Sequence, residues 1–328
     1  MKWSKSVNMK RKIFSGCATI IAVAALAGVG IVLVRLMDAR QQLSQPAIPA
    51  WPVGADFGSV SELTILPLLE AEAGSPGLHS EHGLSYLIQA GGSTILLDVG
   101  NNLDQTEPAP LLRNMQQLGV SLSSIDALVI SHNHPDHVGG QRWWLKGSFS
   151  IGSSQAALEG KDLYVPVELT YPGSSPQVVL EPHLIAPGVA SLGRQPFLQP
   201  FPFWLWRPLE YEQSLVINVD EYGLVLVTGC GHPGMEQIVA RAEGLFEQPV
   251  VGIVGGLHYL NMGAADLAPH IDYLAARNPQ LVALSPHDNG PGVIQVFERA
   301  FPEEYRYIKV GQPIHFPFQT ALAGAEED

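Results

Sequence analysis

Four side chains that can bind metal ions lie within six residues of one another in the stretch "LVISHNHPDHVGG" (128–140): His132, His134, Asp136 and His137. Neutral imidazole and carboxylate are ligands that Zn²⁺ and similar divalent ions prefer, at roughly 2.0–2.2 Å. Because Pro135 stiffens the turn, these side chains can converge on one point or on two neighbouring points. The stretch therefore predicts a metal site rather than a chance cluster of surface histidines.

Predicted strands position this stretch. The apolar run "IDALVIS" (125–131) predicts a buried strand that ends at the metal-binding residues, and "STILLDVG" (93–100) predicts another that ends near Asp98. Open sheets usually bind their ligands at the carboxyl ends of strands. We therefore expect the metal site at such an edge, with Asp98 as the partner of a ligand or as a structural aspartate beside it.

The rest of the body alternates between short apolar strands and amphipathic helices. Further strands are predicted over 62–69, 84–90, 213–219, 223–229, 249–256 and 281–287, with a hairpin at "AGGS" (90–93). Helices are predicted over 107–120, 233–246, 264–278 and 292–301. This order indicates a layered α/β fold with sheets inside and helices outside.

Residues 138–212 give no clear pattern. They include the aromatic stretch "FLQPFPFWLWRP" (197–208). This stretch could line a substrate pocket, pack as a loop on the body, or touch a membrane, since Trp prefers the interface.

Four motifs, "TILLDVG", "SHNHPDHVGG", "LVTGCGHPG" and "LSPHDNG", resemble in this order the successive motifs of the metallo-β-lactamase superfamily. Within it, "SEHGLSYLIQAGGSTILLDVG", "GCGHPGMEQIV" and "VGGLH" are most similar to the branch around the dihydropterin-ribofuranosyl-aminobenzene phosphate synthases. The resemblance covers residues 62–317. It implies an αββα four-layer sandwich of the metallo-β-lactamase type, with metal ions at one edge.

The resemblance also implies six metal ligands: His132, His134, Asp136, His137, His232 and His287. The first two would hold one metal ion and the next two a second, while each of the last two would complete one of the sites. His232 and His287 both lie just past predicted strands, as this geometry needs. The expected cofactor is Zn²⁺, two ions per chain, although the same ligands also suit iron or manganese.

The chain departs from the superfamily pattern in two places. Many superfamily hydrolases have a bridging aspartate in a Gly-Asp pair, where this chain has Gly229-Cys230. Cys230 could bind metal as a thiolate or be a buried bystander, and Glu212 is another residue that could supply the bridge. Where relatives often carry His-Cys-Thr-Gly, this chain reads "HDNG" (287–290), which leaves any role of the Cys-Thr pair open.

A metal centre of this kind implies hydrolytic chemistry. Divalent ions lower the pKa of bound water from about 15.7 towards 7 and polarise the electrophile. Asp136 could orient that water and accept its proton. His258, in "GGLH", could be a ligand, a substrate-facing acid or base, or a packing residue. Glu81 and His82 would line the pocket or support a ligand by resemblance, or otherwise belong to a turn.

The N-terminus differs in composition from the body. Residues 1–12 hold five Lys or Arg, and residues 13–34 hold no charged side chain. An apolar run of this length can span the bilayer as a helix, and the preceding basic residues favour a cytoplasmic N-terminus. We therefore expect a single-pass membrane protein with an extracytoplasmic catalytic domain. Cleavage near Ala27, which would release a secreted protein, is the alternative.

These patterns divide the chain into five predicted parts: a basic N-terminus (1–12), a transmembrane anchor or signal peptide (13–34), a linker (35–61), a metallo-β-lactamase-like domain (62–318) and an acidic tail (319–328). The net charge of −13 argues against nucleic acid as a partner. The expected partners are a small-molecule substrate and, through the N-terminal helix, the membrane. The sequence gives no oligomeric state.

Four hypotheses for the function follow. The first is a membrane-anchored dinuclear metal hydrolase that acts on an ester, lactone, amide or phosphoester. The second is a metal-dependent synthase or transferase that acts on a pterin-like or phosphorylated substrate. The third is an iron-dependent oxidative enzyme with the same ligands, and the fourth is a binding module without catalytic activity.

Overall fold

The structure is a computed structural model of the 328-residue chain, and it describes residues 23–43, 50–51, 56–199 and 208–318. The predicted basic N-terminus and acidic tail lie outside the described residues. The chain forms two compact units: residues 48–195 together with 211–328, and residues 1–47 together with 196–210. The first unit carries the predicted metal ligands.

A seven-stranded sheet forms one half of the larger unit, in the order β15-β1-β2-β3-β4-β5-β6. Its strands are β1 (Leu63–Leu69), β2 (Ser85–Ala90), β3 (Ser93–Leu97), β4 (Ala127–Val129), β5 (Asp162–Val165), β6 (Gln177–Val178) and β15 (Ile314–Phe316). Strands β2 and β3 pair antiparallel across Gly91-Gly92, which confirms the predicted hairpin. Strands β3, β4 and β5 run parallel, so their carboxyl ends lie at one edge.

A six-stranded sheet forms the other half, in the order β14-β13-β12-β11-β8-β7. Its strands are β7 (His183–Ala186), β8 (Val189–Ser191), β11 (Leu215–Val219), β12 (Gly223–Thr228), β13 (Val250–Gly255) and β14 (Leu281–Leu284). Strands β12, β13 and β14 are parallel. The predicted pair over 213–219 and 223–229 is confirmed as the antiparallel pair β11–β12.

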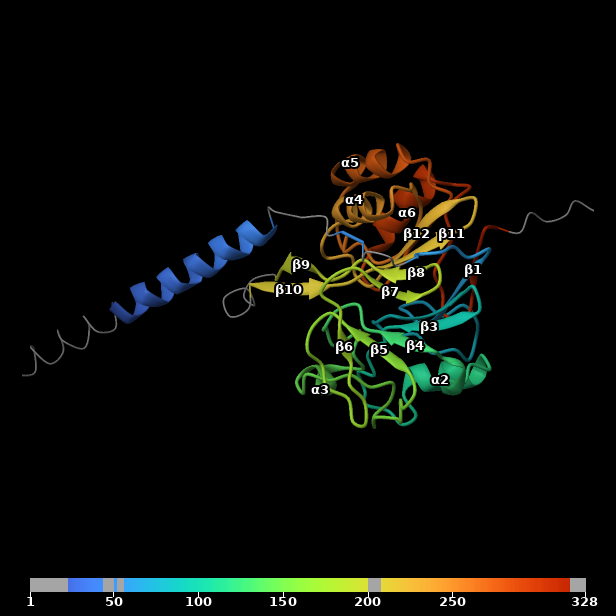
Figure 1. Cartoon of the computed structure of the whole chain (residues 1–328), viewed down its shortest axis with the longest axis horizontal. Coiled ribbons are helices and arrows are strands. Elements are labelled where there is room, and N and C mark those ends of the chain that lie inside the picture. Colours follow the sequence, from blue (N-terminus) through green and yellow to red (C-terminus); the bar gives the residue numbers. More distant parts are fainter. Residues whose placement is uncertain (1–22, 44–49, 52–55, 200–207, 319–328) are drawn as a thin grey trace, which may run out of the picture. The chain divides into compact units, whose positions relative to one another are not determined.

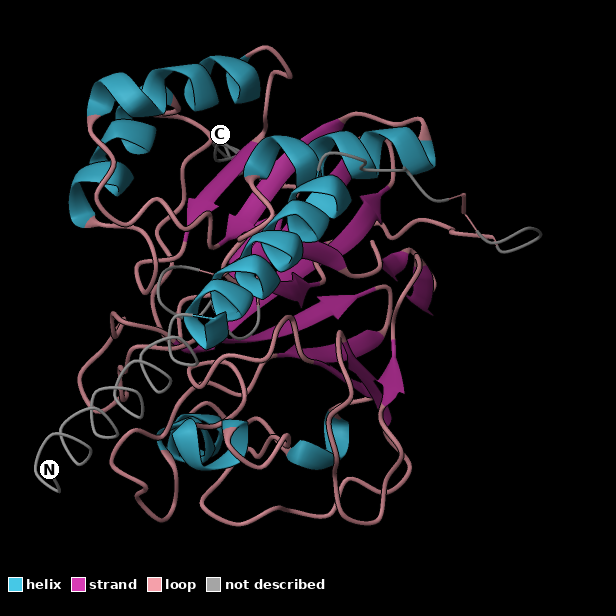
Figure 2. Ribbon diagram, turned by 90° about the vertical axis from the view of Figure 1, so that its left-hand side faces the viewer, coloured by secondary structure: helices cyan, strands magenta, loops and turns pink. Residues whose placement is uncertain are grey.

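Helices cover the outer face of each sheet (Figures 1 and 2). Helix α2 (Pro110–Gln117) and the short α3 (Gln141–Trp144) lie over the seven-stranded sheet, and α4 (Met235–Phe246), α5 (Ala264–Ala275) and α6 (Pro291–Ala300) lie over the six-stranded sheet. The result is a helix–sheet–sheet–helix sandwich. The predicted layered α/β fold is confirmed.

The period-two alternation of the strands fills three separate cores. In β3, Ile95 and Leu97 point into the core between the sheets, whereas Leu96 packs towards α2. In β12, Val225 and Val227 join the core between the sheets, and Leu226 packs under the helices. Both faces of each central strand are therefore buried, which is why these strands read as continuous apolar runs.

The region without a clear sequence pattern, 138–212, contains α3, β5 to β8 and a two-stranded sheet of β9 (Gln195–Leu198) and β10 (Leu209–Glu212). These strands are two to four residues long, too short to show periodicity. Residues 200–207 of the aromatic stretch lie outside the described residues. Its role stays a prediction.

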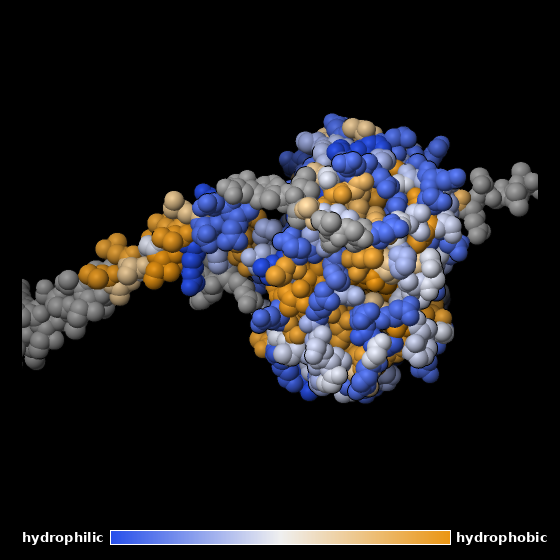
Figure 3. Space-filling view, viewed as in Figure 1, coloured by the Kyte–Doolittle hydropathy of each residue, from blue (hydrophilic) through white to orange (hydrophobic). Residues whose placement is uncertain are grey.

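The predicted membrane anchor is corrected. Part of it, residues 13–22, lies outside the described residues, and a helix over residues 23–43 continues beyond it. No helix in the described part of the chain is both long enough and apolar enough to cross a membrane, because this one carries Arg35, Asp38 and Arg40 in its second half. Figure 3 shows the change from apolar to hydrophilic residues along it. The predicted single-pass localisation is therefore wrong. The predicted partners, a small-molecule substrate and the membrane, stay predictions.

Candidate metal centre

The six predicted ligands come together at one edge of the sandwich, from loops that follow three parallel strands. His132, His134, Asp136 and His137 follow β4 of one sheet, whereas His232 follows β12 and His287 follows β14 of the other. The loops converge because the carboxyl ends of parallel strands in both sheets face the same edge. A site of this kind is available only after the two sheets have packed together.

The side chains form two groups of three. The ligand atoms of His132, His134 and His232 lie within 4.8 Å of one another, and those of Asp136, His137 and His287 form a second such group. Imidazole ring centroids are 4.4 Å apart for His132 and His134 and 5.2 Å apart for His137 and His287. These are the two groups that the resemblance predicted.

Asp98 lies buried between the two groups and orients a histidine of each. Its Oδ2 is 2.7 Å from Nδ1 of His137 and accepts a hydrogen bond of 2.6 Å from the Ser131 hydroxyl, which in turn lies 3.0 Å from Nδ1 of His132. Its Oδ1 accepts the Ser131 backbone N–H at 2.6 Å. Asp98 also has a φ of 58°, a region that non-glycine residues seldom adopt and that is enriched at functional sites.

Glu212 holds His232 in the same way. Its carboxylate lies 2.9 Å from Nδ1 of His232 and accepts the backbone N–H groups of Cys230, Gly231 and His232 at 2.8–3.0 Å. Burial alone would raise the pKa of Glu212, but the hydrogen bonds from His232 and these N–H groups lower it to about 2. Glu212 is thus an ionised support for the Cys230–His232 loop. Both of its carboxylate oxygens accept hydrogen bonds from this loop, and a bridging role for Glu212 stays a prediction.

Glu70 supports His287. This buried carboxylate follows β1 and lies 3.4 Å from Nδ1 of His287. It also accepts hydrogen bonds from the hydroxyls of Ser285 and, at 2.7 Å, Tyr86. Ser285 is itself hydrogen-bonded to Nδ1 of His287.

The hydrogen bonds at Nδ1 make these histidines suitable as metal ligands. In four histidines, His132, His137, His232 and His287, Nδ1 is engaged by a hydroxyl or a carboxylate. Such a contact fixes the proton on Nδ1 and leaves Nε2 as the donor to a metal ion. Burial and the neighbouring imidazoles lower the pKa of His132 far below its usual value, so His132 stays neutral, which is the form that binds metal.

Cys230 lies where the two groups meet. Its Sγ is 3.2 Å from Nε2 of His137 and 3.4 Å from Nε2 of His287. Asp288 is also buried here, and its Oδ2 accepts the backbone N–H of His258 at 3.1 Å. Burial raises the pKa of Asp288 to about 7.

The other predicted site residues lie outside the two three-ligand groups. His258 is exposed, with its ring centroid 4.5 Å from that of His232, and its φ of 56° is again in the left-handed region. His82 is exposed, with Nε2 3.5 Å from Oδ2 of Asp136. Glu81 instead accepts the backbone N–H groups of Asn102 and Leu103, so it orders the loop after β3.

Sequence reasoning missed the partners of the histidines. Glu70, Ser131 and Ser285 were not selected, and Glu212 was considered only as a source of the bridge. One signal was present: "LLE" (68–70) ends β1 just as "LLD" (96–98) ends β3. Nothing in the local sequence pairs either carboxylate with a particular histidine.

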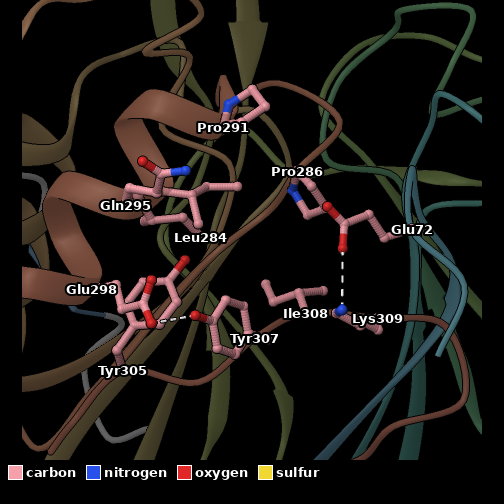
Figure 4. A pocket seen from close by; sticks show the side chains of 11 residues that line it. Glu72, Leu284, Pro286, Pro291, Gln295, Glu298, Tyr305, Tyr307, Ile308 and Lys309 are labelled. Atoms are coloured by element: carbon pink, nitrogen blue, oxygen red, sulfur yellow. Dashed lines mark hydrogen bonds and ion pairs between the residues drawn. The ribbon is translucent and has the colours of Figure 1, made fainter. Parts of the chain in front are cut away.

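A separate pocket of about 230 Å³ adjoins the loop that carries His287 (Figure 4). Pro286 and Pro291 line it, and so do an ion pair of 3.4 Å between Lys309 and Glu72 and a hydrogen bond from Tyr307 to Glu298. None of the predicted site residues lines this pocket. It is therefore distinct from the candidate metal centre.

The fold and the position of the histidines define a class, the metallo-β-lactamase fold. Residues 81–149 match the metallo-beta-lactamase superfamily. The chain is similar to a solved metal-dependent hydrolase of the beta-lactamase superfamily, with 21% identity and a TM-score of 0.54 over 77% of this chain and 98% of the other. The predicted resemblance to this superfamily is confirmed.

A relative from the predicted branch is similar to the chain over most of its length. The chain is 26% identical over 303 residues to the 7,8-dihydropterin-6-methyl-4-(beta-D-ribofuranosyl)-aminobenzene-5'-phosphate synthase of Methanocaldococcus jannaschii. The alignment covers 80% of this chain and 99% of the relative. The sequence motifs pointed to this same branch.

Proposed function

We propose that the chain is a metal-dependent hydrolase with a dinuclear centre. His132, His134 and His232 would hold one ion, and Asp136, His137 and His287 the other. The observation that carries this proposal is the pair of three-ligand groups, each within 4.8 Å, with imidazoles oriented by Asp98, Glu212 and Glu70. Divalent ions bound there would supply an activated water and polarise an ester, lactone, amide or phosphoester.

Asp136 and His258 would transfer the protons in this reaction. Asp136 is partly exposed, with 19% of its side chain accessible, so it can reach both the centre and a bound substrate and accept a proton from the nucleophile. His258 lies beside His232 and opens to solvent. From there it can transfer a proton to or from the leaving group.

Metal analysis and substrate assays test this proposal. Protein purified without added metal should contain two zinc ions per chain and hydrolyse members of a panel of esters, lactones and phosphodiesters. The variant His134→Ala should lose one ion, and its kcat should fall at least about a hundredfold, the lower end of the range for the loss of a catalytic group. His315→Ala, which alters an exposed histidine on β15, is the matched control. Stoichiometric iron with oxygen consumption would contradict a hydrolase.

A second candidate function is a metal-dependent synthase. The similarity to a relative that is named as a synthase, over nearly its whole length, favours it. Incubation with a pterin and a ribofuranosyl-aminobenzene phosphate, the two parts of that relative's named product, would separate the candidates. A joined product in the mass spectrum supports the synthase, whereas cleavage of the ester panel without a joined product supports the hydrolase.

A further inference from the structure

Cys230 occupies a position that the proposed ligand set does not use. Its side chain is buried, and Sγ lies 3.2 Å from Nε2 of His137 and 3.4 Å from Nε2 of His287. Sγ also lies within 4.8 Å of ligand atoms of His132 and, in another group, of His232. A single sulfur atom is therefore close to members of both three-ligand groups.

His137 and His287 each place their Nε2 atom next to this sulfur. Nδ1 of His137 is engaged by Asp98, and Nδ1 of His287 by Ser285 and Glu70. When each ring carries its single proton on Nδ1, the form in which imidazole binds metal, both Nε2 atoms turn a lone pair towards Cys230. A thiol has one hydrogen and can donate it to only one of them. A cation bound to all three atoms would satisfy both lone pairs and the sulfur.

The distances agree with shared coordination. Zn–S and Zn–N bonds of roughly 2.3 and 2.0–2.1 Å place sulfur and nitrogen about 3.2–3.6 Å apart for bond angles of about 95–110°. The observed 3.2 and 3.4 Å lie in this range. The sulfur thus already lies at ligand spacing from each of the two nitrogens.

We propose that the Cys230 thiolate is a metal ligand placed between the two ion positions, and that it makes the centre select Zn²⁺ over Mn²⁺. This inference rests on the proposed metal centre. On binding, the S–H bond breaks, the sulfur donates its electron pair to the ion, and one proton is released to solvent. A thiolate is a soft ligand that favours zinc, whereas a carboxylate also suits manganese and magnesium.

Cobalt(II) spectroscopy on a single-cysteine protein tests the assignment. The chain has two cysteines, so the full-length variant Cys17→Ser leaves Cys230 as its one thiol. Cobalt loading of this protein should produce a thiolate-to-cobalt charge-transfer band in the near ultraviolet. The double variants Cys17→Ser/Cys230→Ser and Cys17→Ser/Cys230→Asp should bind cobalt without that band. The ratio of the Kd values for manganese and zinc should fall at least roughly tenfold in the Cys230→Asp protein.

Alkylation of the thiol gives a second measurement that needs no change at Cys230. Zinc should slow the reaction of the Cys17→Ser protein with iodoacetamide at least about tenfold relative to metal-free protein, because the bound thiolate is no longer free to react. Titration of zinc into weakly buffered protein should release more protons from Cys17→Ser than from the variant that also lacks the Cys230 thiol.

The outcomes separate this inference from the proposed function. Cobalt binding at the stoichiometry of the centre, with no charge-transfer band and no protection from alkylation, overturns the role of Cys230 and leaves the metal centre intact. Protein that binds no cobalt or zinc overturns the proposed centre itself.

Discussion

Carboxylates orient the histidines of the candidate centre. Asp98, Glu212 and Glu70 are buried, and each lies against Nδ1 of a different imidazole. A histidine held in this way presents Nε2 in a fixed direction and is a stronger donor to a metal ion. The metal affinity of the chain should therefore depend on three residues that touch no ion.

We expect Glu212→Gln to weaken zinc binding by about 10- to 100-fold. Glutamine removes the charge that faces His232 and leaves part of the backbone N–H set poorly paired, which costs about 1–3 kcal/mol of stability. Competition with a chromophoric chelator measures the affinity. Glu221→Gln, which alters an exposed residue in the turn between β11 and β12, should change neither quantity; equal affinities for the two variants would contradict the role of Glu212.

Asp98→Asn should weaken binding over a similar range of about 10- to 100-fold, because the amide no longer offers a charged acceptor to both His137 and Ser131. Asp126→Asn is a close control. Asp126 lies before β4, and its Oδ2 accepts the backbone N–H of Thr94 at 2.8 Å, at the end of the β3–β4 pair opposite the centre. If isothermal titration gave both variants the same loss of affinity, Asp98 would be acting only as a link between strands.

The ends of the strands are packed so closely that specific residues are required there. Gly229 follows β12, and a Cβ at this position would lie 2.2 Å from Oγ of Ser131 and 3.3 Å from Oδ2 of Asp98. Only glycine lets the two sheets approach at this point without displacing the hydrogen bonds that orient His132 and His137. The loop after β12 thus reaches the loop after β4 because one residue has no side chain.

Gly229→Ala tests this close approach. Displacement of Ser131 should cost about 1–3 kcal/mol, lower the Tm and weaken metal binding at the same time. Gly292→Ala, in α6, meets nothing within 4 Å and should leave the Tm unchanged or raise it, because alanine is the better helix former by roughly 0.5–1 kcal/mol. Differential scanning fluorimetry with and without zinc compares the two. A Gly229→Ala protein with unchanged Tm and affinity would show that the strand ends can move apart freely.

The candidate centre joins the two sheets of the sandwich. Four of its ligands belong to a loop of the seven-stranded sheet and two to loops of the six-stranded sheet. The core between the sheets holds them together without metal. Bound metal would nevertheless stabilise the sandwich, because it binds the packed sheets and not the separated ones.

Removal of metal should therefore lower the Tm without unfolding the protein. At a free metal concentration of 100 Kd, binding contributes about 2.7 kcal/mol, which corresponds to a shift of about 5–11 °C for a domain of this size. Melting curves before and after dialysis against a chelator measure it, and added zinc should restore the original Tm. Metal-free and metal-loaded proteins that melt at the same temperature would contradict a centre that spans the sheets.

Much of this architecture could be predicted from the sequence because its signals are local. The apolar runs of β3, β12 and β13 and the amphipathic helices α4 and α6 follow from periodicity. The short strands of 138–212 do not, since two to four residues show no period. The predicted anchor failed because the described helix continues past the apolar run into charged residues that begin at Arg35.

Residue type and spacing alone predict a metal site at "HNHPDH", directly after an apolar strand, and the resemblance to the superfamily adds the two histidines after later strands. How these ligands are grouped and supported depends on the packed fold. Glu212 and His232 are 20 residues apart, and Glu70 and Ser285 are 215 apart. Contacts over such separations depend on how two sheets pack, which local periodicity does not encode. For the same reason, the sequence left Cys230 open, and the folded chain placed its sulfur between two imidazoles.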